Sequence, residues 1–164
     1  MLLSEEAYRK IDQELTKFPD DQKQSAIMAA LTLAQDEKGW ISNDVIEDVA
    51  AYLEVPPIAV QEVATFYDMY NTRPVGKYKL SVCTNLPCAL RDGVKAAEHI
   101  KKRLGIANHE TTEDGLFTLV EAECMGSCGD SPVLLVNDKV MCIRMSTEKI
   151  DSLISELSND AESA

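Results

Sequence analysis

Four of the five cysteines in the chain fall into two close pairs. The first pair is Cys83 and Cys88, and the second is Cys124 and Cys128. Thiolates bind soft or borderline metals, and four of them supplied by two loops can close a tetrahedral zinc site or hold an iron-sulfur cluster. The spacing therefore predicts a four-thiolate metal site and leaves the identity of the metal open.

Other uses of the cysteines explain the pattern less well. Disulfides need an oxidising compartment, and residues 1–6 run directly into acidic sequence with none of the apolar stretch of a signal peptide. Buried structural cysteines behave as small hydrophobic residues and have no reason to occur in two pairs. A dithiol-disulfide oxidoreductase would favour two cysteines separated by two residues. Cys142 lies outside both pairs and is expected to be a free, partly buried thiol.

The composition limits the classes of protein to consider. The chain has 164 residues, 45% of them hydrophobic, and a formal net charge of -12. This length suits one or two small domains with a substantial core. The negative charge argues against nucleic acid as a ligand, because nucleic-acid-binding proteins carry basic surfaces. No apolar run is long enough for a membrane span, so we expect membrane association only through a partner.

The cysteines are carried by the second half of the chain, and the first half has a helical pattern. Apolar residues recur there every three or four positions, with Ser4 as an N-cap and Gly39 as a helix stop. The residues expected to face inward are Tyr8, Ile11, Leu15 and Phe18, then Ile27, Ala30, Leu31 and Ala34, then Val45, Ile46, Val49 and Leu53, then Val60, Val63, Ala64 and Tyr67. The pattern predicts four helices over residues 4–70.

After a linker at residues 71–76 the pattern changes from helical to alternating. It predicts a strand at 77–83, a helix with Val94, Ala97, Ile100 and Leu104 on one face, and a second strand at 117–122. A strand, a helix and a strand in this order form a βαβ unit with parallel strands and a right-handed crossover.

The remaining sequence predicts a hairpin and a last helix. Strands at 133–136 and 139–144 are joined across Asn137 and Asp138, and Ser146 can cap the helix that follows. The polar tail after Ser158 is expected to fray.

The βαβ unit brings the cysteines together. Cys83 ends the first strand and Cys124 lies just beyond the second. Parallel strands end at the same edge of a sheet, where open α/β sheets place their ligands. We therefore expect both cysteine pairs to form one shared site.

Residue chemistry favours a cluster over zinc at this site. Zinc sites prefer two cysteines separated by two residues and often use histidine, and neither His99 nor His109 is placed to help. A cluster suits the longer spacings and needs backbone N–H donors around its sulfurs. The candidate donors are Asn85, Leu86, Gly126, Ser127 and Gly129. A zinc-stapled interaction module stays open as the alternative.

Several segments of the chain resemble a known family. The matching segments are Lys38–Ile41, Val63–Tyr67, Arg73–Tyr78, Cys83–Cys88 and Glu121–Val133. Over about residues 5–158 the chain resembles the thioredoxin-like [2Fe-2S] subunit of the NADH-dehydrogenase module of respiratory complex I, the NuoE type. Similar subunits serve NAD-linked hydrogenases and formate dehydrogenases, and these segments do not separate the three.

The resemblance implies an α+β protein. It has an N-terminal four-helix bundle over residues 1–72 and a thioredoxin-like [2Fe-2S] ferredoxin domain over residues 73–164. Cys83, Cys88, Cys124 and Cys128 would be the ligands of one [2Fe-2S] cluster that carries electrons near a flavin.

The resemblance also implies a division of labour between subunits. NADH and FMN would bind a flavoprotein partner, which forms a heterodimer with this chain. The chain would have no catalytic residue and no independent turnover, and it would bind no nucleic acid. It would be cytoplasmic in a bacterium, held at the inner face of the plasma membrane by the complex and not inserted into it. The absence of glycine-rich nucleotide-binding motifs agrees with this division.

Overall fold

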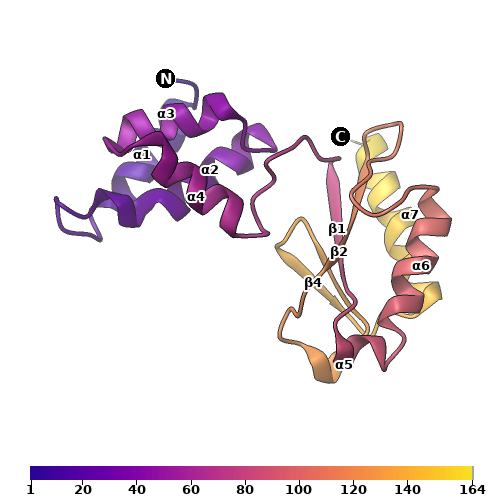
Figure 1. The fold of residues 1–164 in the computed structure, drawn as a ribbon. Helices are drawn as coiled ribbons and strands as arrows, with labels where there is room; N and C mark the ends of the chain where they lie inside the picture. Colours follow the sequence, from indigo (N-terminus) through magenta and orange to yellow (C-terminus); the bar gives the residue numbers. More distant parts are fainter. Residues whose placement is uncertain (164) are drawn as a thin grey trace. The chain divides into compact units, whose positions relative to one another are not determined.

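The structure, a computed structural model, describes residues 1–163 and the side chains of residues 1–161. The chain divides into two compact units, Met1–Pro74 and the remainder from Val75 onward (Figure 1). The sequence pattern predicted a linker at residues 71–76, and the family resemblance placed the division between residues 72 and 73. Each unit has a hydrophobic core of its own.

Unit 1 is helical. Its helices are α1 (Glu5–Leu15), α2 (Ile27–Lys38), α3 (Asn43–Leu53) and α4 (Pro57–Phe66), with a short 3₁₀ helix at Lys23–Ala26. The side chain of Ser4 accepts a hydrogen bond from Ala7 N–H and caps α1, and Gly39 ends α2 with a φ of 82°. The fully buried side chains of this core include Ile11, Ile27, Leu31, Ile41, Leu53, Val45 and Val49.

Two inward-facing residues predicted in unit 1 lie outside their helices. α1 ends at Leu15, so Phe18 lies in the turn that follows and packs only partly against the core. Tyr67 is the C-cap of α4 in an extended conformation, and its ring is exposed. In both cases the helix ends before the periodic pattern does, because periodicity indicates a face and not the end of a helix.

Unit 2 contains a four-stranded sheet in the order β2-β1-β3-β4. The strands are β1 (Tyr78–Cys83), β2 (Phe117–Ala122), β3 (Val133–Val136) and β4 (Val140–Ile143). β1 and β2 are parallel, as the βαβ pattern predicted, while β3 runs antiparallel to both β1 and β4. Asn137 and Asp138 connect β3 to β4 with φ of 52° and 55°, the left-handed conformation that tight hairpins need.

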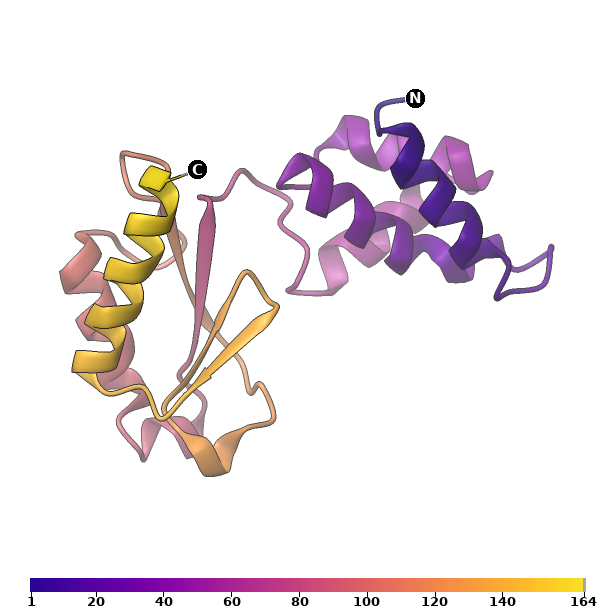
Figure 2. The same ribbon diagram turned by 180° about the vertical axis from the view of Figure 1, so that it is seen from behind.

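Two helices cover one face of this sheet. α6 (Gly93–Leu104) and α7 (Thr147–Ser163) lie side by side on it (Figures 1 and 2). Leu80, Leu119, Ile100 and Ile150 are among the fully buried residues between the layers. α7 continues beyond Ser158, where the polar composition had predicted fraying.

The predicted inner face of α6 was wrong at its first turn. Val94 is exposed, whereas Ala96, Ala97 and Ile100 are buried with Gly93. Gly93 takes the inward position of the first turn, which leaves Val94 on the outer side. No helix within residues 1–163 combines the length and apolar character that crossing a membrane requires.

Candidate metal centre

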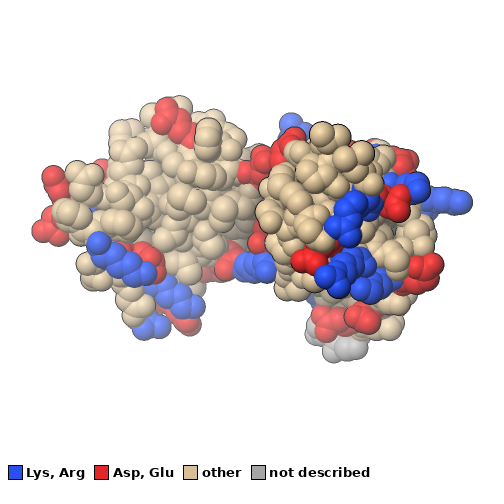
Figure 3. All heavy atoms as spheres, turned by 90° about the horizontal axis from the view of Figure 1, so that it is seen from below, with Lys and Arg blue, Asp and Glu red and all other residues tan. Residues whose placement is uncertain are grey.

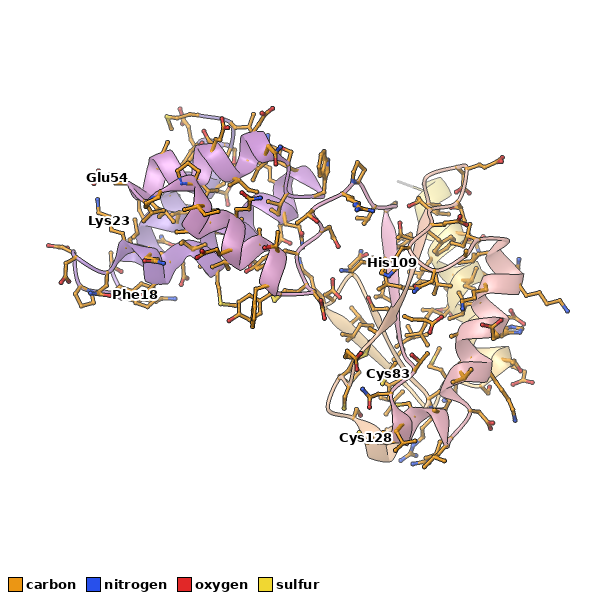
Figure 4. All side chains as sticks on the ribbon, viewed as in Figure 1. Phe18, Lys23, Glu54, Cys83, His109 and Cys128 are labelled. Atoms are coloured by element: carbon orange, nitrogen blue, oxygen red, sulfur yellow. The ribbon has the colours of Figure 1, made fainter. Side chains whose placement is uncertain are left out.

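The two cysteine pairs lie at the same edge of the sheet. Cys83 is the last residue of β1, and its register partner Ala122 is the last residue of β2, so the parallel strands end side by side. Cys124 follows in the loop just beyond β2. Figure 4 shows Cys83 and Cys128 at this end of unit 2, while His109 lies toward the other end. The parallel pairing thus brings both loops to one edge.

The first loop holds its two thiols inside the protein. Cys83 and Cys88 are 1% and 2% exposed, and they form a small apolar cluster with Val133 and the partly buried Met125. Cys88 lies in α5 (Leu86–Ala89), a single helical turn that the sequence pattern did not predict. A turn of this length is too short to produce a periodic pattern.

The second loop holds its thiols near the surface. Cys124 is exposed, and Cys128 is half-buried at the start of a 3₁₀ turn, Cys128–Asp130. The two Sγ atoms are 3.5 Å apart. Two thiolates bound to one tetrahedral ion through bonds of about 2.3 Å lie about 3.8 Å apart. The second pair therefore has nearly the separation that two ligands of one ion require.

The four thiols are arranged as two pairs. Cys83 and Cys88 belong to one buried cluster, and Cys124 and Cys128 contact each other through their Sγ atoms. Within residues 1–163, no group of three or more His, Cys, Asp and Glu side chains is arranged to hold a metal ion. Two thiol pairs supplied by two loops are a donor set that a binuclear iron-sulfur group can use.

Backbone N–H groups from both loops influence the pKa of the Cys83 thiol. Burial raises the pKa of the Cys83 thiol, and hydrogen bonds from the N–H groups of Asn85 and Met125 oppose that rise. The same donors would stabilise the negative sulfur of a metal-bound cysteine. Sequence reasoning missed Met125, because nothing in the order of residues shows that the second loop reaches the first cysteine.

The second pair has an electrostatic asymmetry. Gly126 N–H donates to Cys124 Sγ at 3.4 Å, and this bond, together with Cys128, lowers the pKa of Cys124. The pKa of Cys128 is raised, first by its contact with Cys124 and then by burial. Cys124 is therefore the thiol of this pair that deprotonates first.

The candidate N–H donors named from the sequence lie in different surroundings. Those of Asn85 and Gly126 face a sulfur, whereas that of Leu86 donates to Asn85 Oδ1 at 3.0 Å. Ser127 and Gly129 flank Cys128, and their part in binding stays a prediction.

Polar side chains connect the two loops. Asn85 Nδ2 donates to Glu123 Oε2, and Arg91 Nη1 donates to the carbonyl oxygen of Gly129 at 2.6 Å. These bonds join residues that are 38 positions apart in each case. They fix one cysteine loop against the other.

The remaining sulfur and imidazole groups lie elsewhere. Cys142 is a free, half-buried thiol in β4, and burial raises its pKa. His99 Nε2 lies 2.9 Å from Asp151 Oδ1, in a shallow pocket lined also by Lys102 and Arg103. His109 lies away from the sheet edge that carries the paired cysteines (Figure 4).

Fold and site together define a protein with a mixed helix-and-sheet scaffold that gathers two thiol pairs at one sheet edge. The chain belongs to the thioredoxin-like [2Fe-2S] ferredoxin family, whose model matches residues 11–158. The family resemblance inferred from the sequence segments is thereby confirmed.

Curated relatives carry a more specific name, the E subunit of NADH-quinone oxidoreductase. The relative from Rickettsia felis is 45% identical over 147 residues, which cover 89% of this chain and 87% of the relative. The relative from Rickettsia bellii is 42% identical over 147 residues, which again cover 89% of this chain and 87% of the relative. That of Rickettsia prowazekii is 41% identical over 150 residues, 91% of this chain and 84% of the relative.

Solved structures agree on the fold. An NAD⁺-reducing [NiFe]-hydrogenase in the air-oxidized state matches with a TM-score of 0.71 at 19% identity. The match covers 82% of this chain and 23% of that chain, so this chain spans about a quarter of the hydrogenase chain. At this identity the likeness concerns the fold alone.

Proposed function

We propose that the chain is the electron-transfer subunit of an NADH:quinone oxidoreductase, the respiratory complex I. It would hold one [2Fe-2S] cluster through Cys83, Cys88, Cys124 and Cys128, near the flavin of a partner protein. The observation that carries the proposal is the meeting of two thiol pairs at one sheet edge, in a chain 41–45% identical to members of that complex.

The residues of the site suit this role. When bound, a [2Fe-2S] cluster supplies one-electron redox chemistry. Cys83 and Cys88 would hold the group with thiols that water does not reach, whereas Cys124 would hold it with an exposed thiol. The N–H groups of Asn85, Met125 and Gly126 direct positive dipoles at the sulfurs.

Catalysis would depend on other subunits. The chain would bind neither NADH nor FMN, and we assign both to a flavoprotein partner in a heterodimer with this chain. One-electron transfer requires no general acid or base from this chain. Its contribution would be to the oxidoreductase activity of the whole complex.

An exposed apolar surface beside the first cysteine loop supports a docking partner. Leu86, Leu90 and Val94 are 68%, 78% and 48% exposed; Leu86 lies in α5, Leu90 is its C-cap and Val94 lies in the first turn of α6. Exposed apolar side chains of this size are candidates for contact with a partner. Figure 3 looks onto this end of unit 2, where uncharged surface adjoins lysine, arginine and acidic groups.

The same proposal includes the packing of the helices in unit 1 and the cellular location of the chain. The four helices of unit 1 would form a bundle, and the chain would lie in the bacterial cytoplasm, at the inner face of the plasma membrane, through its complex. A place in an NAD-linked hydrogenase or formate dehydrogenase is the alternative. The names of the relatives favour the quinone-linked complex.

Anaerobic purification of the full chain tests the proposal. We expect a red-brown protein with two iron atoms per chain and a paramagnetic signal after reduction with dithionite. A colourless protein with one tightly held zinc would instead establish the zinc-stapled module and end the proposal. Copurification with untagged partners then identifies the complex: an FMN-containing subunit together with quinone-linked subunits is expected, and a hydrogenase or formate dehydrogenase subunit would favour the alternative.

A further inference from the structure

Ser131 places a buried hydroxyl between the two cysteine pairs. Its Oγ lies 3.1 Å from Cys88 Sγ, and its O–H donates to the carbonyl oxygen of Cys128 at 2.8 Å. Ser131 is 4% exposed and Cys88 is 2% exposed, so water has little access to this contact. A hydroxyl next to a sulfur in a low dielectric interacts with it more strongly than in water.

The direction of this hydrogen bond depends on the state of Cys88. A neutral thiol can donate its S–H to Ser131 Oγ. The serine O–H then continues to donate its hydrogen bond to the carbonyl oxygen of Cys128. A metal-bound thiolate has no proton and can only accept. The contact is then favourable only if the serine hydroxyl rotates and donates to Cys88 Sγ. Hydrogen bonds to a charged acceptor are stronger than those between neutral groups.

We propose that Ser131 is a positioning residue that donates a hydrogen bond to the Cys88 thiolate and raises the reduction potential of the bound cluster. This inference rests on the function proposed above. Reduction of a bound cluster would add one electron, and the sulfurs would share the added negative charge. A donor to one of those sulfurs therefore stabilises the reduced state more than the oxidised state.

The test measures the midpoint potential of the full-length chain in an anaerobic titration with dithionite and redox mediators. Ser131→Ala removes the hydroxyl and is expected to lower the equilibrium constant for reduction about threefold to tenfold. For one electron this is a shift of roughly 30 to 60 mV to more negative potential. Ser131→Thr keeps a hydroxyl at the same position and is expected to restore most of the wild-type value.

Ser81→Ala is the matched control. Ser81 is 3% exposed, and its Oγ lies 3.4 Å from Asp138 Oδ1 and not beside a sulfur. The control removes an equally buried hydroxyl, so we expect it to leave the potential unchanged. Thermal unfolding of each variant without iron records any general loss of packing separately from the potential.

The outcomes separate this inference from the proposed function. A wild-type potential in Ser131→Ala overturns the role of Ser131 and leaves the cluster in place. Equal lowering in Ser131→Ala and Ser131→Thr also overturns it, because packing would then be the cause. Loss of iron in Ser131→Ala, with a wild-type potential in Ser131→Thr, supports a requirement for the hydroxyl. A colourless wild-type chain refutes the proposed function itself.

Discussion

At the scale of single residues, burial and hydrogen bonding divide the five cysteines. Cys83 and Cys88 are inside, Cys124 and Cys128 lie near the surface, and Cys142 is alone in β4. The pairs could be predicted from the sequence because metal ligands in loops recur at short spacings. The contact of Ser131 with Cys88 could not, because it joins residues 43 positions apart through the folded chain.

Cysteine variants test the ligand set. Cys124→Ala is expected to weaken metal binding more than about 100-fold, because changes to groups that only orient the ligands already cost 10- to 100-fold. The visible spectrum and the iron content of the purified variant measure this loss. Cys142→Ser removes the thiol outside the pairs and should leave both unchanged. A spectrum lost in the Cys142 variant would show that the ligand set is wrong.

At the scale of secondary-structure elements, the sequence predicted which segments are helices or strands, and how the strands pair, better than it predicted where helices end and which helix face is buried. β1 and β2 are parallel as expected, because a strand, helix and strand in series allow few other topologies. The exposure of Val94 and the presence of α5 were missed, since both depend on how the first cysteine loop packs beneath α6.

Gly93 is where α6 meets that loop. A Cβ at this position would lie 2.8 Å from the carbonyl oxygens of both Cys83 and Cys88. Gly93→Ala should therefore displace the loop and cost about 1–3 kcal/mol of unfolding free energy, more than the gain of up to about 1 kcal/mol that alanine brings within a helix. Denaturant unfolding and iron content measure the two effects.

Gly129→Ala is the matched control for Gly93. It adds a methyl group next to Cys128, where nothing lies within 4 Å, and it keeps the backbone N–H. We expect the control to fold with wild-type stability. Equal stability and equal iron content in Gly93→Ala would show that the loop has room for the added carbon.

A carboxylate connects α1 to α2 in unit 1. Glu37 accepts hydrogen bonds from Ser4 N–H at 3.0 and 3.2 Å, and these bonds, followed by Lys38, lower the pKa of Glu37 from 4.5 to about 2. A lowered pKa stabilises the fold above pH 4.5, and this stabilisation is lost as the pH falls toward 2. Glu37→Gln should lower the melting temperature at neutral pH, by an amount that shrinks between these values. A difference that stays constant with pH would contradict this linkage.

At the scale of the whole molecule, the candidate metal ligands are confined to one unit. All four paired cysteines lie in unit 2, which has its own core, and the core of unit 1 is formed by its own helices. The composition of the linker at residues 71–76 and the change of period after it predicted such a division. The exact boundary between the two units depends on tertiary contacts, which the periodicity of the sequence does not reveal.

The last prediction concerns the independence of unit 2. A chain that begins at Val75 should fold and bind the same cluster, because the sheet, α6, α7 and both cysteine loops are all retained. We expect its visible spectrum and its paramagnetic signal to match those of the full chain, and we expect residues 1–74 alone to be colourless. A colourless or aggregated fragment, beside a coloured full chain, would show that unit 2 requires the N-terminal helices to form its metal centre.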